Sequence, residues 1–505
     1  MSSPKKLSPQ EEPLLPTTQP DESSLLETFS FCCCKIKLDV FLIIIMINNF
    51  LVNACFSNIM PFFPQEAHSK GVPEYLVGII FAALPFGGIL SSFFLAKYIS
   101  KIGRKRALLF GVFINIVTAT VLGCLKFVDN EMIFIIIAIV SRFFQGCGRS
   151  AYSTATFSSI SVIYPTTMQK KIGYTESVSG LGMMLGPLLG SGLYSLGGYP
   201  APFFCFAVIF LLMFPVTIHN LNKLKILDKE VSKKQRILKI SEFITERRVF
   251  SLFLAIIIGN INMTWLGPTF AYHLISYGMG AAYIGLIYPV GTVAYIVSIK
   301  MLNSLFKNFE KKLLISLGLF LNVISQVLVG PQPILPQNIS IVIGSQFFLG
   351  SSLAFIFIPF IPELSILGSK IYPDDKSSVS DMASGLFSAG ITVGGVIGPI
   401  LGGILFSVLG FVYESSIFGL MALSVLMIYL SFGDGLVGIV RFLKRKEEKK
   451  EQKEQKEKEE NLLGSCEIRV EETKSLANEE EIKRNEFNST VVPFNESILM
   501  KEGKN

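Results

Sequence analysis

The sequence is poor in charge and in the side chains from which catalytic sites are built. Only 16% of its 505 residues are charged, against about 25% in a soluble globular domain. The three histidines, His68, His219 and His273, stand far apart in the chain, so no metal site is expected. Neither a phosphate-binding loop nor a nucleophile constellation is found. These absences argue against an enzyme or an ATP-driven pump, and no cofactor is expected.

Long apolar segments make up much of the chain. Half of it is hydrophobic, and a segment of about 20 apolar residues is long enough to cross a bilayer. We therefore predict an all-α polytopic protein embedded in a lipid bilayer. The net charge of +7 does not indicate a nucleic-acid partner, because its location matters more than its sum. The twelve transmembrane helices are predicted at 38–62, 75–96, 107–126, 132–155, 172–195, 200–219, 249–272, 281–302, 313–330, 339–361, 378–407 and 411–432.

Basic residues gather in the connections on one side of these helices. The connection after the second helix is basic at Lys97, Lys101 and 104–106, and the long central connection at 220–248 is also rich in Lys and Arg. Lys and Arg in short connections mark the cytosolic side of a membrane protein. This side and both termini are therefore predicted to face the cytosol.

The two halves of the chain repeat one another. Pro61-Phe-Phe63 matches Pro268-Thr-Phe270, and Gly186-Pro-Leu-Leu-Gly190 matches Gly398-Pro-Ile-Leu-Gly402, at separations of 207 and 212 residues. Two parallel six-helix halves are typical of a rocker-type secondary transporter with its substrate site between the halves. The predicted units are a disordered N-terminal segment at 1–35, halves at 36–219 and 249–433, a basic linker at 220–248, and an amphipathic segment with a disordered charged tail at 434–505.

Two of the predicted helices carry a glycine face. In the fifth helix the face is Gly182, Gly186 and Gly190, with Pro187 inside the run, and in the eleventh it is Gly394, Gly398 and Gly402, with Pro399. Residues four apart lie on one side of a helix, and in a bilayer a bare face lets a neighbouring helix approach closely. We expect the fifth helix to contact the eighth through this face, and the eleventh to contact the second.

Several motifs together resemble the major facilitator superfamily, and within it the polyamine-transporter-like branch of the vesicular amine transporter group. They are Met60 to Gly71, the loop Ala96 to Lys105 with Gly103 and Arg104, Arg142-Phe-Phe-Gln-Gly146, and Glu176 to Pro187. The resemblance covers about residues 38–432. It implies proton-coupled antiport of a small organic cation or polyamine-like solute by alternating access. It favours a vesicular or endolysosomal membrane, as does the stretch Asp21 to Leu26, which resembles an acidic dileucine sorting signal.

The departures from the family pattern bear on the substrate and on gating. The superfamily loop has Ser100 where an Asp is usual. Monoamine-carrying relatives place carboxylates in the first, seventh and eleventh helices. Here the first has no acid between Ile47 and Asn53, and the other two have Gly267 and Ser388 at the matching places. The monoamine site therefore does not transfer to this chain.

Glu176 is the strongest candidate for a functional residue. An ionised carboxylate about 7 Å inside a membrane helix is expensive unless it has a partner or takes up a proton. It is either a proton or cation site or a structural ion pair with Arg149. Arg142, near the middle of its helix, is either a charge partner for protonation or a structural clamp on backbone carbonyls. A polar substrate site is predicted from Asn53, Asn260, Gln145, Tyr288, Gln346 and Asn322.

Several alternatives stay open. Each buried amide could instead only hold helices together, and Trp265 fits core packing better than stacking on a cation. Glu363 and Asp381 are expected to be solvated at cytosolic helix ends. The protein could also be a plasma-membrane drug-type exporter or facilitator, or a receptor on a transporter fold. We expect a monomer. Cys32 to Cys34 are either palmitoylated or inert.

Overall fold

The computed structural model describes residues 26–31, 34–164, 167–223, 244–306, 309–330, 336, 338–371, 376–433, 435–438, 440, 474–476 and 478–484. Residues 1–436 form one compact unit and residues 437–505 a second. Most of the predicted sorting signal, Cys32, Cys33 and most of the basic linker lie outside the described residues.

The described residues of the N-terminal half form seven α-helices, in addition to a 3-10 turn at Leu125–Phe127. The α-helices are α1 (Val40–Ser57), α2 (Phe63–Ser69), α3 (Glu74–Ile102), α4 (Arg104–Cys124), α5 (Glu131–Ile163), α6 (Met168–Gly197) and α7 (Pro200–Lys223). Side chains before two of these helices satisfy free backbone donors, as expected at a helix start. Asp39 accepts from the Leu42 amide at 3.2 Å, and Asn130 accepts from the Ile133 amide at 3.1 Å.

The C-terminal half repeats this plan. Its helices are α9 (Arg247–Thr264), α10 (Leu266–Ser276), α11 (Ala281–Ser304), α12 (Lys311–Val329), α13 (Ile339–Ile371), α14 (Lys376–Leu409) and α15 (Phe411–Phe432). α9 and α10 form one segment bent by 40° at Trp265. Pro268 lies just beyond the bend, and because it lacks an N–H it cannot continue the backbone ladder of α9.

The prediction of an all-helical, multi-pass membrane protein is confirmed. Ten of the described helices are long and apolar enough to span a membrane, and the bent pair α9–α10 makes an eleventh. The remaining predicted segment corresponds to α6, which packs beside α1 and α11. Its glycines and serines lower its mean hydropathy, so it is not among the helices that are apolar enough to span a membrane by this measure.

A two-stranded antiparallel hairpin precedes α1. Strand β1 (Leu26–Phe31) pairs with β2 (Cys34–Asp39), with Leu26 opposite Asp39 and Phe31 opposite Cys34. The expectation of disorder up to residue 35 is therefore corrected for the described residues of the hairpin.

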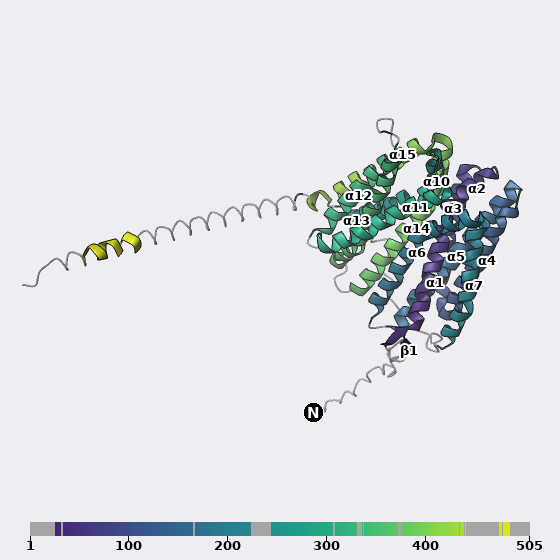
Figure 1. Ribbon diagram of the computed structural model, residues 1–505, viewed down its shortest axis with the longest axis horizontal. Helices are drawn as coiled ribbons and strands as arrows, with labels where there is room; N and C mark the ends of the chain where they lie inside the picture. The colour runs from purple at the N-terminus through teal and green to yellow at the C-terminus, as the bar shows by residue number, and fades with distance from the viewer. Residues whose placement is uncertain are drawn as a thin grey trace, which may run out of the picture. The chain divides into compact units, whose positions relative to one another are not determined.

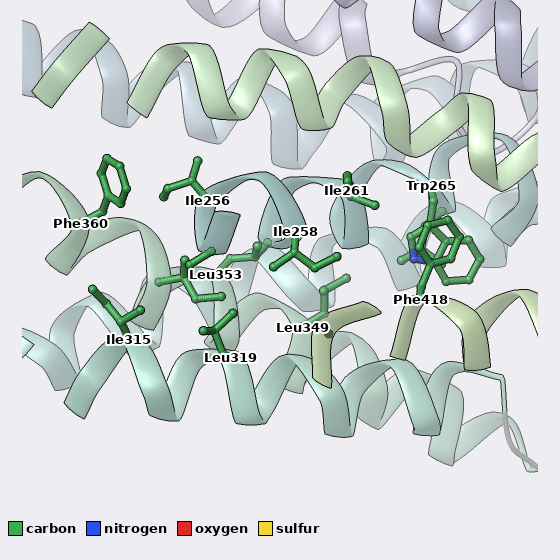
Figure 2. Packing of buried hydrophobic residues seen from close by; sticks show 14 of the residues in the cluster. Ile256, Ile258, Ile261, Trp265, Ile315, Leu319, Leu349, Leu353, Phe360 and Phe418 are labelled. Carbon is green, nitrogen blue, oxygen red and sulfur yellow. The ribbon is translucent and has the colours of Figure 1, made fainter. Parts of the chain in front are cut away.

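Each half packs around its own hydrophobic interior. α4 lies between α5 and α7 in the N-terminal half, and α12 packs on α13 in the C-terminal half (Figure 1). Figure 2 shows the C-terminal core, in which Ile256, Leu319 and Leu353 converge and Trp265 lies against Phe418 at one end. The buried clusters of the N-terminal half draw their residues from 41–221. The halves meet mainly through α3 with α14 and α6 with α11.

The glycine face of α6 packs against α1, not against the eighth helix as predicted. Gly182, Gly186 and Gly190 lie on the backbone carbonyls of Phe50, Ala54 and Asn58, and a Cβ at Gly186 would lie 2.5 Å from the Ala54 oxygen. α6 does contact α11, but through the adjacent face, where Gly285 of α11 approaches Pro187. A period of four identifies one face of a helix without saying which neighbour covers it.

The glycine face of α14 is corrected in the same way. Gly394, Gly398 and Gly402 lie on the carbonyls of Ile257, Ile261 and Trp265 in the seventh segment. The predicted contact with α3 is made one residue further round the helix. There Gly403 lies near the Glu74 carbonyl and Gly395 near Pro85.

The two halves touch at one end of the bundle, which we call the sealed end; it carries α2, α10 and the α14–α15 turn. The Tyr272 hydroxyl donates to the Pro64 carbonyl at 2.6 Å, and the Tyr288 hydroxyl donates to the Met60 carbonyl at 3.4 Å. The opposite end, the basic end, carries Lys105 and Lys170. At the basic end, no described atom lies within 4 Å of a Cβ added to Gly180 of α6 or to Gly385 of α14. The hydrogen bonds of Tyr272 and Tyr288 join the two halves at the sealed end.

The predicted orientation can be tested by glycosylation. Asn338 is exposed directly before α13 and accepts a hydrogen bond from the Ser340 amide at 3.0 Å. In the orientation predicted from Lys and Arg it faces away from the cytosol, so Asn338→Gln is expected to remove all N-glycan, seen as a gel-mobility shift lost with a glycosidase. Asn488→Gln and Asn495→Gln, both in the tail, are expected to change nothing. Glycan on the tail would overturn the orientation.

Candidate functional site

A polar cluster joins α1 to α5 inside the N-terminal half. The Arg149 guanidinium donates to Asn53 Oδ1 from Nε at 3.2 Å and from Nη2 at 2.9 Å. Asn53 in turn donates from Nδ2 to the Asn49 carbonyl at 2.8 Å. Asn49 extends the cluster to α6, because its Nδ2 donates to Ser179 Oγ at 2.6 Å. The cluster thus connects three helices of one half.

Arg142 is fully buried in the same region. Its Nη1 donates to Gln145 Oε1 at 2.7 Å and lies 3.5 Å from the Phe56 carbonyl. The guanidinium carbons of Arg142 and Arg149 lie 5.6 and 4.8 Å from the centre of the Phe56 ring. Among the described residues, Nε and Nη2 of Arg142 have no hydrogen-bond partner. Because an unpaired buried charge is costly, these nitrogens are available to a transient anionic partner.

Glu176 of α6 lies in electrostatic range of the Arg149–Asn53 cluster. It lies eight residues into α6, about 12 Å along the axis, and it is exposed. It interacts electrostatically with Arg149 of α5 and with Tyr295 of α11. Within the described part of the chain, however, it makes no ion pair of 4.0 Å or less. Arg149 is hydrogen-bonded to Asn53 in this conformation and is also an electrostatic partner of Glu176, so the structural ion pair stays an open alternative.

The candidates of the C-terminal half are separate from the Arg149–Asn53 cluster. Asn260 donates from Nδ2 to the Ile391 carbonyl and so joins α9 to α14. Gln346 of α13 is buried, and its Nε2 has no partner among the residues described. Tyr288 of α11 crosses between the halves to Met60.

Two other candidates hold the C-terminal half together. Asn322 is fully buried, accepts from Asn262 and donates from Nδ2 to Ser352 Oγ at 3.1 Å. These bonds favour the alternative in which its amide holds helices together. Trp265 is fully buried and stacks on Phe418 at 4.8 Å, as core packing predicts.

The loop motif between α3 and α4 has a structural basis. Gly103 takes φ +87°, a left-handed conformation that favours glycine, and this lets the chain turn between the two helices. Arg104 donates from Nε to Ser158 Oγ of α5 at 2.8 Å. The motif thus fixes α4 against α5 at the basic end. The side chain of Ser100 lies outside the described residues.

The burial of two acidic residues was not predicted from the sequence. Glu363, expected to be solvated, is buried, and Glu414, which was not singled out, is fully buried. Glu414 lies in the first turn of α15, so in the sequence it looks like an ordinary helix-end acid. The side chain of Asp381 falls outside the description.

Comparisons with known proteins identify the wider group. Residues 45–380 match the family model described as the Major Facilitator Superfamily. The chain is 28% identical over 384 residues to the human "MFS-type transporter SLC18B1", covering 73% of this chain and 80% of that protein. It is 29% identical over 379 residues to the mouse protein of that name, with the same coverage.

Solved structures show the same fold at low identity. The nucleoside transporter NupG has a TM-score of 0.58 at 12% identity, covering 78% of this chain and 99% of that one. The peptide transporter POT, as the E310Q mutant with sulfate, has a TM-score of 0.60 at 14% identity, covering 82% and 99%. A bacterial homologue of human Spinster, described as inward-facing and unoccupied, has a TM-score of 0.54 at 14% identity, covering 79% and 94%.

Proposed function

We propose that this chain, which belongs to the Major Facilitator Superfamily, exchanges protons for a small organic solute across a vesicular or endolysosomal membrane. The family match makes it an integral multi-pass secondary transporter of a small-molecule substrate and not an enzyme. The coupling ion, the substrate class, the membrane and a monomeric state belong to the proposal.

The observation that carries the proposal is the position of Glu176. An exposed carboxylate on α6, with Tyr295 of the opposite half in electrostatic range and without a close ion pair among the described residues, is free to exchange its proton. A cationic substrate and a proton compete for the same negative charge, which is the requirement for antiport. The seal at the other end of the bundle keeps the two compartments apart while this exchange takes place.

A pH gradient across the membrane supplies enough free energy to accumulate the solute. One pH unit corresponds to about 1.36 kcal/mol, so a difference of two units supplies about 2.7 kcal/mol per proton. That supports about a hundredfold accumulation for each proton exchanged with a monovalent cation, because this exchange moves no net charge.

A second substrate class follows from Arg142. Its two nitrogens without hydrogen-bond partners in the described residues, together with Arg149, which also lies over the Phe56 ring, make the interior of the N-terminal half cationic. An anionic or zwitterionic solute would be favoured there. The cation proposal depends on Glu176, and the anion alternative depends on Arg142.

One experiment separates these possibilities. Purified protein in proteoliposomes with an imposed pH gradient would be tested for uptake of labelled polyamines, monoamines and organic anions. We expect gradient-dependent polyamine uptake that a protonophore abolishes. Uptake of anions alone would favour an anionic substrate bound near Arg142. Uptake that does not depend on the pH gradient would favour a facilitator. Binding of a solute without counterflow would identify a receptor, since a receptor binds without turnover.

We expect weak or no transport of dopamine and serotonin. A monoamine needs a counter-charge in a cavity of low dielectric constant, because an unpaired buried cation is strongly disfavoured. At the places where monoamine-carrying relatives have that charge, Gly267 lies against Phe81 and Ser388 is an exposed hydroxyl, and Glu176 in α6 is not at one of these places. Saturable uptake of either amine in the same proteoliposomes, at a rate comparable to the best polyamine, would refute this inference.

A further inference from the structure

Glu414 is a buried carboxyl group at the sealed end of the C-terminal half. Among the described residues, neither of its side-chain oxygens has a hydrogen-bond donor within normal geometry, and no charged group interacts with it. A negative charge in such a place is strongly disfavoured. The neutral, protonated form therefore fits this conformation.

The neighbouring hydroxyl can bond to either form of the carboxyl group, because a hydroxyl both donates and accepts. Thr269 of α10 lies beside the carboxyl group, and its own proton is donated to the Trp265 carbonyl at 3.1 Å. In that arrangement its oxygen is left as an acceptor. A protonated carboxyl can donate to that oxygen, whereas a carboxylate can only accept.

Glu414 faces the bend between α9 and α10. Trp265, the residue at the bend, stacks on Phe418 at 4.8 Å and lies 5.4 Å from Phe411, residues one turn to either side of Glu414 (Figure 2 shows the Trp265–Phe418 stack). A Cβ on Gly402 of α14 would lie 3.0 Å from the Trp265 carbonyl and 3.2 Å from Glu414 Oε1. The carboxyl group is thus enclosed between the bend, α14 and α15.

Other titratable groups lie near this end: His68 of α2, whose Nδ1 is 3.9 Å from Glu74 Oε1, and Tyr272 and His273 of α10. On α10, His273 stacks on Phe411 with 3.9 Å between ring centres. The residues near the bend from the other packed helices are uncharged. These are Trp265 of α9, Gly402 of α14 and Gln326 of α12, whose Oε1 accepts from Trp265 Nε1 at 3.1 Å.

The bend is mechanically connected to the seal. α10 carries Tyr272, whose hydroxyl bonds to Pro64 of the other half at 2.6 Å and whose ring lies 5.9 Å from that of His68. A change in the angle between α9 and α10 would move Tyr272 away from α2. It would also admit water to Glu414, because Trp265 and Thr269 cover it.

We propose that Glu414 is a proton-binding site that controls the sealed end. With the proton bound, α10 stays packed on α14 and α15 and the end remains closed. When α10 moves away, the carboxyl group is hydrated and releases the proton. The closed state thus holds one proton more than the open state, so acid favours closure and rising pH favours opening, by up to about tenfold per pH unit. The proposal rests on alternating access in this family and is independent of Glu176.

The test measures distance rather than transport. Spin labels at Gln65→Cys on α2 and Ser276→Cys on α10, both exposed, report the width of this end in a cysteine-free full-length chain. Pulsed electron resonance between pH 5 and pH 8 is expected to show a long-distance population that grows with pH. Glu414→Gln is expected to keep the short distance at every pH.

A matched control lies in the other half. Glu66 is a buried carboxylate near the same end but is paired with Lys126 at 3.0 Å, so Glu66→Gln is expected to retain the pH response. If Glu414→Gln does not fold, Glu414→Asp keeps the carboxyl group and should move the midpoint of the response. An unchanged midpoint in Glu414→Asp, or a normal response in Glu414→Gln, would overturn the proposal.

The outcome is separable from that of the proposed function. Glu176→Gln is expected to keep the pH-dependent distance change while it loses gradient-driven accumulation. The wild-type protein could accumulate substrate while the distance between the α2 and α10 labels does not change with pH. That result would refute the role of Glu414 but not proton exchange at Glu176.

Discussion

Glu176→Gln is expected to abolish accumulation driven by a pH gradient while the protein still folds and reaches its membrane. Glutamine keeps the shape of the protonated side chain but can neither release nor bind a proton. With a gradient of two pH units, accumulation should fall from about a hundredfold to about equal concentrations on both sides. Exchange of substrate for substrate is expected to survive, because it needs no net proton movement. Both quantities can be measured in the same proteoliposomes.

Arg149 provides the control for this prediction. If Glu176 were a structural ion pair with Arg149, Glu176→Gln would leave a buried cation unpaired, yield would fall, and Arg149→Met would restore it. In the structure Arg149 already bonds to Asn53, so we expect a normal yield for Glu176→Gln and no benefit from the second change. A well-expressed Glu176→Gln protein with unimpaired accumulation would remove Glu176 from the mechanism.

The sequence predicts those parts of the site that depend on local spacing. Arg142 and Gln145 lie three apart on one helix, so their contact follows from helix geometry, and the structure has it at 2.7 Å. The contact of Arg149 with Asn53 depends on how α5 packs on α1. No periodicity contains that information, which is why the ion pair with Glu176 is an equally reasonable expectation.

Burial is the other property that a single sequence leaves open. Glu414 and Glu363 both look like acids near helix ends, where solvation is the default. They are buried because neighbouring helices extend past them, as α9, α10 and α14 do at Glu414. Asn322 shows a related ambiguity. A polar residue in an apolar helix predicts a polar environment, which can be a bond between helices, as to Asn262 and Ser352 here, or a substrate cavity.

The second large effect concerns the glycine face of α6. Gly186→Leu is expected to prevent normal packing, because its side chain would be directed at the Ala54 carbonyl and the Ser57 side chain of α1. A backbone atom cannot rotate away as a side-chain end can. Overpacking typically costs 1–3 kcal/mol and sometimes more, so α6 must shift from α1 or the fold must loosen. We expect most of the protein to be lost from the monodisperse peak in size-exclusion chromatography, and transport by the remainder to be impaired.

Gly192→Leu on the same helix is the matched control. No described atom lies within 4 Å of a Cβ at Gly192, and replacing glycine within a helix removes a propensity cost of about 1 kcal/mol. Its melting temperature is therefore expected to be unchanged or raised, while that of Gly186→Leu falls. In the other half Gly398→Leu should behave like Gly186→Leu, since its Cβ would lie 2.9 Å from the Ile261 carbonyl of α9. Normal transport by both Gly186→Leu and Gly398→Leu would show that these faces are not close interfaces. Equal losses in Gly192→Leu and Gly186→Leu would mean that side-chain size, rather than its position on the helix, causes the effect.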